Sequence, residues 1–458
     1  MMRRKHLITS MRQGWAKLLW LFLWLALLSP TFGVERFPPP DFESSYRMPP
    51  TTTPSPRAQW LAWLDVLVLL GALSLASYFV HKKRSRKPIY ALTAFSVLYF
   101  GFYRKGCICA IGSIQDVTLA LFNTGYAVPL TVLAFFLLPL IFTLMFGRTF
   151  CAAVCPLGAI QDVMVVRPVR VPGWIEHALG MVPYFYLGAA VLFAATGSAF
   201  IICKYDPFVA LFRMDGRAVM LAVGAIFLLI GVFVGRPYCR FLCPYGAILN
   251  FVSRFARWNV TLTPEDCLHC QLCDVACPFE AIREPKAVTP PDVRRTAWRR
   301  VTAGLVLLPV LVLVCGWLGS RLAAPLSMVH AKVSLAERIL AEETGKSIEP
   351  TDASKAFRQT GRPVQELYQE ALAIRGQFVI GGWLLGAWFG LVMGLKLVAL
   401  SLPHPAGILT ESGENGKLPY EPDRARCVAC GRCYTHCPKE LVRIKKIQGK
   451  KVIPLTRA

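Results

Sequence analysis

The sequence predicts an all-α polytopic membrane protein with about seven spans, preceded by an N-terminal signal peptide or anchor. Of the 458 residues, 55% are hydrophobic and only 17% are charged. Several apolar stretches approach or exceed the roughly 18 residues that a bilayer crossing needs. Two cysteine-rich runs outside these stretches predict an additional part in water. The expected spans are 60–80, 89–103, 127–146, 181–202, 218–234, 301–318 and 378–400.

The distribution of basic residues predicts the orientation of the spans. A formal charge of +24 would suggest nucleic-acid binding in a soluble domain, but here the basic residues lie mostly in short loops beside apolar stretches. The loop 81–88 carries five Lys/Arg and no acidic residue, so we place it in the cytoplasm. We therefore expect a multi-pass protein of a bacterial inner membrane, in contact with lipid and without a nucleic-acid partner.

The N-terminal part is expected to lie before the membrane domain. Residues 1–33 have a basic head, an apolar stretch and the small pair Thr31/Gly33, as in a signal peptide or an uncleaved anchor. Residues 34–59 are rich in proline and predict an extended extracytoplasmic segment. The transmembrane domain then covers residues 60–250, in which 89–103 is short enough to be either a crossing or a re-entrant segment.

Two runs with the spacing C-x2-C-x2-C-x3-C-P predict iron–sulfur clusters. They are CLHCQLCDVACP, from Cys267, and CVACGRCYTHCP, from Cys427. In bacterial two-cluster ferredoxins the fourth cysteine of each run binds the other cluster. Zinc or disulfides are the alternative, but zinc ribbons use two separated pairs of cysteines. We interpret His269 and His436 as loop residues. The predicted ligands are Cys267, Cys270, Cys273 and Cys437 for one [4Fe–4S] cluster, and Cys427, Cys430, Cys433 and Cys277 for the other.

Crossed ligation requires both runs on one side of the membrane. The two spans between the runs return the chain to the side that it left, so topology and cluster chemistry agree. We therefore expect a cytoplasmic two-cluster ferredoxin-like module split by a transmembrane hairpin. Its first half is 251–300 and its second half, with a basic tail, is 401–458. The hairpin is 301–400 and includes an extracytoplasmic helical insert, 319–377.

A second cysteine motif, C-x3-C-P, occurs twice at the cytoplasmic edge of the expected spans. GRTFCAAVCPLGAIQD (147–162) and GRPYCRFLCPYGAILN (235–250) share it, and KGCICAIGSIQD (105–116) is a weaker copy. Residues i and i+4 share a helical face, and the proline ends or bends the helix. Cys151, Cys155, Cys239 and Cys243 would then form a site for a further cluster or for two redox dithiols; buried packing of the thiols is the alternative.

Other polar residues and cysteines carry weaker predictions. Cys107, Cys109 and Cys203 could form a second redox site on the outer side, whereas Cys315 is expected to pack in an apolar helix. The expected outer loop 203–217 contains Asp206 and Asp215, and it is either a plain turn or a contact for a partner or a quinone headgroup.

The combination of GRPYCRFLCPYGAI with C-x2-C-x2-C-x3-C-P resembles the NosR/NapH group of membrane polyferredoxins, most closely NosR. The resemblance covers roughly residues 89–285 and 425–440, and it extends to both C-x3-C-P pairs and both ferredoxin runs. It implies electron transfer in support of periplasmic reductases, for NosR nitrous oxide reductase in denitrification. NosR proteins carry an FMN domain before the spans, where this chain has the short segment 34–59 without an evident flavin attachment motif. An FMN or copper centre is therefore expected in an extracytoplasmic partner protein.

These observations predict an electron carrier or quinol dehydrogenase subunit and not a substrate-transforming enzyme, because no acid, base or nucleophile constellation is present. The donor would be the quinol pool or a cytoplasmic carrier, and the acceptor an extracytoplasmic reductase system. Two alternatives remain. One is a NapH-like quinol dehydrogenase subunit for another periplasmic reductase, and the other is a redox-sensing or metal-assembly accessory factor.

Overall fold

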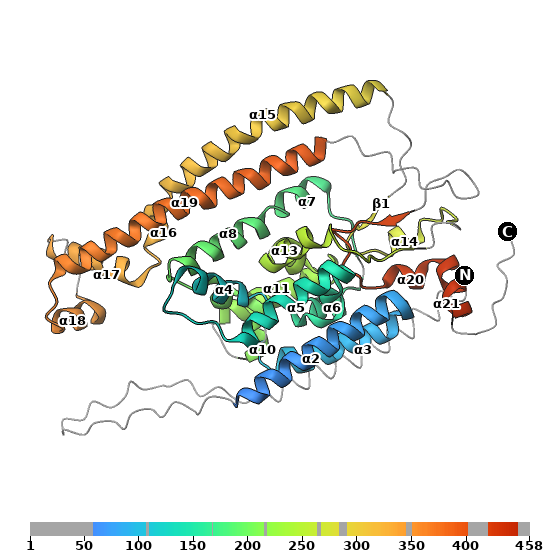
Figure 1. Ribbon diagram of the computed structural model, residues 1–458, viewed down its shortest axis with the longest axis horizontal. Helices are drawn as coiled ribbons and strands as arrows, with labels where there is room; N and C mark the ends of the chain where they lie inside the picture. The colour runs from blue at the N-terminus through green and yellow to red at the C-terminus, as the bar shows by residue number, and fades with distance from the viewer. Residues whose placement is uncertain are drawn as a thin grey trace. The chain divides into compact units, whose positions relative to one another are not determined.

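The computed structural model is mostly helical, as Figure 1 shows. It describes residues 58–106, 110–166, 168–214, 218–262, 267–283, 291–344, 350–401 and 420–447. The expected signal peptide or anchor and nearly all of the proline-rich segment lie outside these residues, as do Cys107, Cys109 and Asp215.

The first two helices run antiparallel. Helix α2 (Gln59–Tyr78) continues into the π-helical turn η1 (Phe79–Lys83), and α3 (Arg86–Ser96) continues into η2 (Val97–Tyr103). Asp65 of α2 is buried; it accepts a hydrogen bond of 2.8 Å from the Tyr99 hydroxyl and pairs with Arg104 at 2.9 Å. The segment 89–103 therefore returns along α2 to the level of Asp65, and this buried ion pair holds its far end.

The centre of the fold is made of short helices, several of which begin at a proline. Cys155, Asp206 and Cys243 each have extended backbone angles and precede the proline that opens α6, α10 or α13. Proline disfavours the helical conformation of the residue before it and suits the first helical position. The elements of this region are α4 (Ser113–Phe122), α5 (Leu130–Phe146), η3 (Phe150–Val154), α6 (Pro156–Met164), α7 (Gly173–Leu179), α8 (Val182–Ala195), α9 (Ile201–Tyr205), α10 (Pro207–Arg213), α11 (Ala218–Gly231), α12 (Pro237–Phe241) and α13 (Pro244–Ser253).

The segment 203–217, expected as an outer loop, is helical in its described part. Asp206 separates α9 from α10 and accepts hydrogen bonds from the backbone N–H groups of Phe208 and Val209. Its second carboxylate oxygen accepts a hydrogen bond of 2.9 Å from the Tyr238 hydroxyl. Asp206 is 3% exposed, so its carboxylate is engaged inside the protein and is not a surface contact for a partner.

Fewer helices than expected are long enough to cross a membrane alone. The described residues contain four such helices, at 59–83, 173–195, 295–321 and 364–401, or five if the bent pair α10–α11 counts as one span. Helices α4 and α5 are apolar but shorter. The expectation of about seven spans therefore stays a prediction, because the breaks at Cys155 and Asp206 divide the apolar sequence into pieces.

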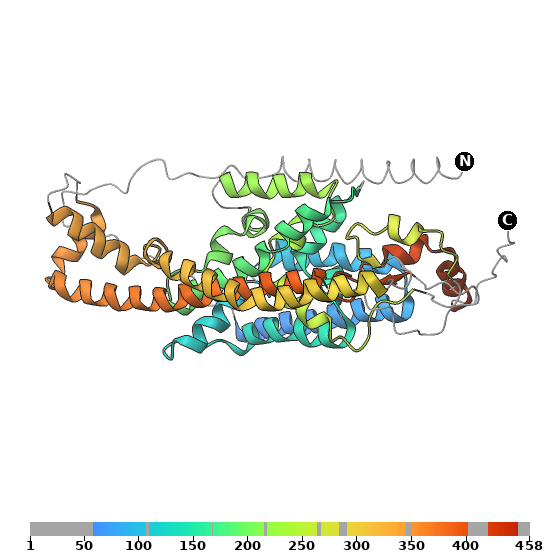
Figure 2. The same cartoon turned by 90° about the horizontal axis from the view of Figure 1, so that it is seen from above.

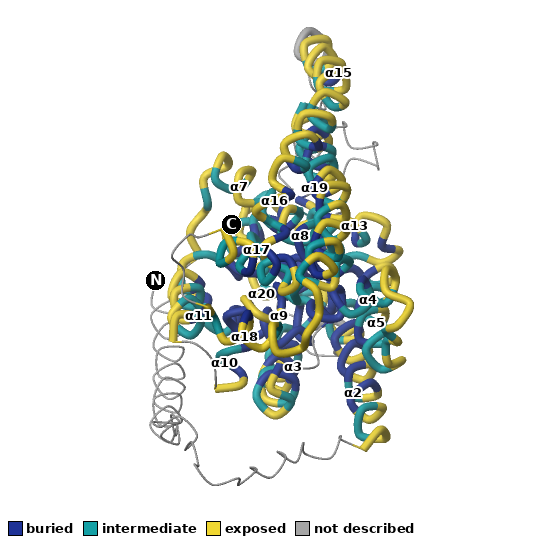
Figure 3. Tube along the Cα trace, turned by 90° about the vertical axis from the view of Figure 1, so that its left-hand side faces the viewer, coloured by how far each residue is buried: buried dark blue, intermediate teal, exposed yellow. Residues whose placement is uncertain are grey.

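The last two long helices form an antiparallel hairpin. Helix α15 (Pro291–Arg321) leads away from the first cysteine run, and α19 (Val364–Ser401) returns beside it, as Figures 1 and 2 show. At the turn lie α16 (Ala323–Ser327), α17 (Ala331–Glu343) and α18 (Asp352–Gln359). Val333, Ile339 and Leu367 form a small core there. Most of α15 is exposed (Figure 3), and its exposed side chains include Leu305, Val306, Val310 and Leu313, as expected of a lipid-facing helix.

A row of glycines on α19 brings the two backbones into contact. Gly382, Gly386, Gly390 and Gly394 recur every four residues and so share one face. A Cβ atom at Gly386 would overlap the carbonyl oxygen of Cys315, and the neighbouring glycines of this row face α15 in the same way. Close approach through small residues is the usual way in which helices associate in lipid.

The two cysteine runs lie together in one module, which a two-stranded sheet joins. Strand β1 (Ile282–Arg283) pairs antiparallel with β2 (Glu421–Pro422). The helices of the module are α14 (Leu272–Val275), α20 (Arg432–His436) and α21 (Pro438–Ile447). Figure 1 places the module at the end of the molecule opposite to α17 and α18.

Replacement of Gly386 by leucine is expected to separate the hairpin and to destabilise the protein by about 2 kcal/mol or more, because the overlap falls on backbone atoms that cannot move alone. Thermal unfolding in detergent measures the loss. Gly376→Leu on the same helix is the matched control, since a Cβ atom there meets nothing within 4 Å. Equal unfolding temperatures for the two variants would contradict the packing argument.

Candidate functional site

The two cysteine runs fold in the same way. In each run the residues before and after the second cysteine have positive φ: His269 and Gln271 in the first run, Ala429 and Gly431 in the second. Three of these four are not glycine, and L-residues seldom adopt this conformation without support from their surroundings. The left-handed turns wrap the loop around one point, toward which the first three cysteines of each run converge.

The first three cysteines of the first run meet the last cysteine of the second. Cys267, Cys270, Cys273 and Cys437 line one small hollow, together with Leu262 and Tyr420. Burial raises the pKa of Cys273 to about 11, and the nearby thiol of Cys437 adds to the shift.

The other four cysteines form a second, more buried set. The Cys433 thiol lies near Cys427, Cys430 and Cys277, and less closely near Cys273 of the first set. Burial raises the pKa of Cys427 to about 12 and also raises the pKa of Cys277. A metal centre binds cysteine as the thiolate, so binding would release the protons of Cys427 and Cys277.

Each set offers four cysteine sulfurs, which is the donor set of a [4Fe–4S] cluster. The amide of Ala281 also donates a 3.4 Å hydrogen bond to the Cys277 sulfur, and such bonds tune cluster potentials.

Asp162, from the first C-x3-C-P segment, fastens the ferredoxin-like module to the helices. Its carboxylate pairs with Arg86 at 2.8 Å, with Arg432 at 3.4 Å and with Arg236 at 3.6 Å. Arg432 belongs to the second cysteine run, and Arg86 also donates a 2.7 Å hydrogen bond to the Cys430 carbonyl. Burial alone would raise the pKa of Asp162, but the three guanidinium groups together lower it to about 2.

Two buried arginines lie between the ferredoxin-like module and the C-x3-C-P cysteines. Arg148 donates hydrogen bonds to the Ala425 carbonyl, at 3.1 Å, and to the Cys151 sulfur, at 3.9 Å. Arg236 donates to the Cys151 carbonyl and lies over the ring of Phe279. The adjacent Gly235 is required because a Cβ atom there would overlap Pro278 of the first run.

The four C-x3-C-P cysteines converge from two segments of the chain. The thiol of Cys243 has Cys239, Cys155 and Cys151 as near neighbours. Cys151 and Cys239 lie within short helices, whereas Cys155 and Cys243 lie at the breaks before proline. The expectation that i and i+4 share a face stays a prediction: the proline forces the second cysteine into an extended conformation at the end of its helix, and the set forms across two segments.

Gln161 joins the two C-x3-C-P segments. Its amide nitrogen donates to the Cys239 sulfur at 3.3 Å, and its oxygen accepts from the Tyr238 amide at 3.0 Å. Gln115 of the weaker copy makes the equivalent bond to the Ile202 amide, also at 3.0 Å. Sequence reasoning missed both glutamines as functional residues, although the repeated Ile-Gln-Asp was the signal for them.

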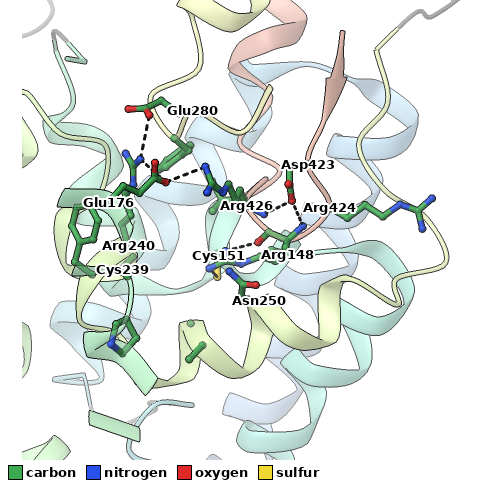
Figure 4. A pocket seen from close by; sticks show the side chains of 18 of the residues that line it. Arg148, Cys151, Glu176, Cys239, Arg240, Asn250, Glu280, Asp423, Arg424 and Arg426 are labelled. Carbon is green, nitrogen blue, oxygen red and sulfur yellow. Dashed lines mark hydrogen bonds and ion pairs between the residues drawn. The ribbon is translucent and has the colours of Figure 1, made fainter. Parts of the chain in front are cut away.

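A cavity of about 940 Å³ opens beside the C-x3-C-P cysteines Cys151, Cys239 and Cys243. Figure 4 shows Cys151 and Cys239 on its wall, with charged side chains around them. Arg240 pairs with Glu176 at 3.0 Å and with Glu280 at 3.6 Å. The lining of the cavity also includes Tyr184, Lys396, Leu400, Arg254 and Asn250. Composition and motif spacing gave no sign of this cavity, which forms only where α8, α13, α19 and β2 meet.

The predictions for the two histidines and for the cysteines outside the motifs have different outcomes. His269 lies in the turn before Cys270, against the ring of Tyr420, as expected of a loop residue. His436 is the last residue of α20 and bonds to the Arg432 carbonyl, so the expectation of a loop residue is wrong for it. Cys315 lies in the hairpin contact, as its packing prediction requires. Cys203 is exposed, and its expected partners Cys107 and Cys109 fall outside the described residues.

Comparison with known proteins adds family evidence. A model of a 4Fe–4S binding domain matches residues 128–174 and 217–263, which contain the two C-x3-C-P pairs but neither ferredoxin run. The regulatory protein NosR of Stutzerimonas stutzeri is 26% identical over 48% of this chain and 33% of its own length. These partial matches support a likeness to NosR/NapH-type membrane ferredoxin-like proteins.

Two further relatives extend the comparison. The methylamine utilization ferredoxin-type protein MauN of Paracoccus denitrificans is 27% identical over 34% of this chain and 54% of its own length. An uncharacterized protein of Methanocaldococcus jannaschii is 27% identical over 40% of this chain and 78% of its own length. The chain thus spans only a third of NosR and about half of MauN. No solved structure matches.

Replacement of Asp162 by asparagine is expected to loosen the ferredoxin-like module, because three arginines lose their shared anion. Hydrogen exchange of the segment around Arg432 should rise at least tenfold. Asp116→Asn is the matched control, since this equivalent residue of the weaker copy accepts a hydrogen bond from Tyr126.

The pH dependence of the same contact has a defined sign. The folded pKa of Asp162, about 2, lies below its ordinary value of 3.8. The carboxylate therefore contributes its stability, about 2 kcal/mol, above pH 3.8 and loses it as the pH falls toward 2. Unchanged exchange in the asparagine variant at pH 7 would contradict the role of Asp162.

Proposed function

We propose that the protein is an iron–sulfur electron-transfer protein of a bacterial inner membrane. It carries two [4Fe–4S] clusters and passes electrons between a quinol or cytoplasmic donor and an extracytoplasmic reductase system. The observation that carries the proposal is the convergence of eight cysteines from two distant runs into two sets of four. The relative MauN is, by its name, a ferredoxin-type protein of methylamine utilization.

The crossed ligand assignment follows from these sets. Cys437 would join Cys267, Cys270 and Cys273, and Cys277 would join Cys427, Cys430 and Cys433. The clusters would supply one-electron redox chemistry with little movement of the protein. Around them, Arg148 and Arg236 offset the negative charge of cluster and thiolates, and the burial of Arg236 strengthens that interaction.

The cytoplasmic side is proposed for the ferredoxin-like module because the basic loop binds it directly. Arg84 pairs with Glu440 and lies over the Tyr434 ring, and Arg86 binds the Cys430 carbonyl. Ile89 lies against Gly431 of the second run. A loop that carries five Lys/Arg is expected to stay in the cytoplasm, and the module then lies there with it.

The four C-x3-C-P thiols are proposed as the membrane-side redox site, either as a further cluster site or as two dithiols. Two observations support a redox role over plain packing. Gln161 and Arg148 direct polar N–H groups at the sulfurs of Cys239 and Cys151. The 4Fe–4S binding-domain matches fall on the two segments that contain these pairs.

The cavity favours the NapH-like alternative, in which a quinol is the donor. It reaches from the sulfurs of Cys151 and Cys239 to Tyr184 and Leu400, at the end of long apolar helices. The Lys396 ammonium lies over the Tyr184 ring and donates a 2.6 Å hydrogen bond to the Gly180 carbonyl. An apolar tail could leave between these helices while the headgroup approaches the thiols.

The crossed assignment predicts which single variants lose the same cluster. Cys267→Ser and Cys437→Ser should abolish one and the same EPR signal, and Cys433→Ser and Cys277→Ser should abolish the other. Wild-type protein should contain at least about eight iron and eight sulfide ions per chain, the content of two cubanes, and more if the C-x3-C-P thiols hold a further cluster. If Cys437→Ser removed the same signal as Cys433→Ser, the ligation would not be crossed.

Replacement of Cys239 by serine should leave both ferredoxin-type signals intact. It should slow electron transfer from a short-chain quinol to the clusters at least tenfold, because the membrane-side redox site loses a thiol. Rapid mixing followed by optical spectroscopy measures the rate. Cys315→Ser, in the hairpin, is the matched control. A wild-type rate in Cys239→Ser would assign the C-x3-C-P thiols to packing.

A further inference from the structure

We propose that the face of the first cysteine run around Cys270 is a docking surface for a small, acidic, soluble electron-carrier protein. The inference rests on the proposed function and deepens it, because it identifies where a cytoplasmic partner exchanges electrons with the chain. It also assigns an order to the two thiol sets, the first set facing the partner and the second facing the membrane-side thiols.

The two thiol sets differ in what surrounds them. The second set is enclosed: Cys430 and Cys433 are buried, and Arg148 lies between Cys427 and the C-x3-C-P thiols. In the first set Cys270 is exposed. Because electron tunnelling weakens steeply with distance, a soluble partner would reach the first set and not the second.

The exposed cysteine lies among exposed apolar side chains. Leu268, Leu272 and Val275 have exposed fractions of 56%, 47% and 67%. Leu272 and Val275 are three residues apart on α14, so they share a face. Apolar side chains at the surface of the module, away from the long apolar helices (Figure 1), are unexpected unless a protein covers them. Interfaces of electron-transfer proteins are small and transient, which three side chains around a redox site suit.

The charge beside this face selects an acidic partner. Residues 401–458 contain eleven Lys/Arg and five Asp/Glu, a net charge of +6. Lys439 lines the hollow of the first thiol set, and Arg443 is exposed on the same helix. The acidic residue of α21, Glu440, is buried and pairs with Arg84. Opposite charge on the partner would steer it to this face.

The exchange is a one-electron step. The carrier would be oxidised by one electron, and the [4Fe–4S] cluster that the first thiol set would hold would be reduced by one, with no bond made or broken in either protein. The exposed backbone of the run and the three apolar side chains need only hold the carrier's redox centre close to Cys270 for the duration of the encounter.

The test uses the full-length protein in detergent and a reduced, acidic [2Fe–2S] ferredoxin as the probe. Stopped-flow spectroscopy follows reduction of the chain, and dithionite serves as a small reductant that needs no docking. In Leu272→Glu and Val275→Glu the ferredoxin rate should fall at least tenfold while the dithionite rate is unchanged. Leu340→Glu, an exposed leucine of α17 at the opposite end, is the matched control.

Ionic strength and charge reversal give a second measurement. The wild-type rate should fall as salt is raised from 20 mM to about 300 mM, because screening shortens the reach of the charges, and Arg443→Glu should weaken this dependence. An unchanged ferredoxin rate in both glutamate variants would overturn the docking surface while the clusters remain. Wild-type protein that shows no cluster EPR signal and no bleaching with dithionite would instead overturn the proposed function itself.

Discussion

The carboxylate of Asp162 is the interaction on which the arrangement depends. It lies directly after Gln161, which binds the sulfur of Cys239, and it pairs with arginines from the basic loop, from the second C-x3-C-P segment and from the second cysteine run. One buried anion therefore positions two thiol systems relative to each other. Three cations around one carboxylate leave positive charge in a low-dielectric region, and negative thiolate centres nearby offset it.

The sequence predicted the composition of the site better than the course of the chain. The eight ferredoxin-type cysteines are recognisable because their spacing is local, and their grouping follows from the return of the hairpin. The helix breaks at Cys155, Asp206 and Cys243 are also foreseeable, since each precedes a proline. The number of spans is harder to predict from the sequence. An apolar stretch can be buried in lipid or inside the protein, and hydropathy does not distinguish a full crossing from a short, broken helix.

Long-range contacts were beyond sequence reasoning. Asp162, Arg148 and Arg236 lie in the C-x3-C-P segments, yet their side chains contact residues far along the chain. A buried arginine cannot be told from a surface one by its neighbours in sequence. The cavity is a stronger case, because its wall combines residues from 148 to 428. The pairing of Gln115 and Gln161 with equivalent backbone amides becomes visible only when both copies are folded.

The split of the cysteine module around the hairpin has a consequence for biogenesis. The first run leaves the ribosome long before β2 and the second run exist, and β1 has no strand to pair with until then. Helices α15 and α19 must enter the bilayer and meet along their glycines before the two halves can join. Loading of the proposed iron–sulfur clusters would thus be coupled to completed membrane insertion, and a chain whose hairpin failed to insert would stay without them.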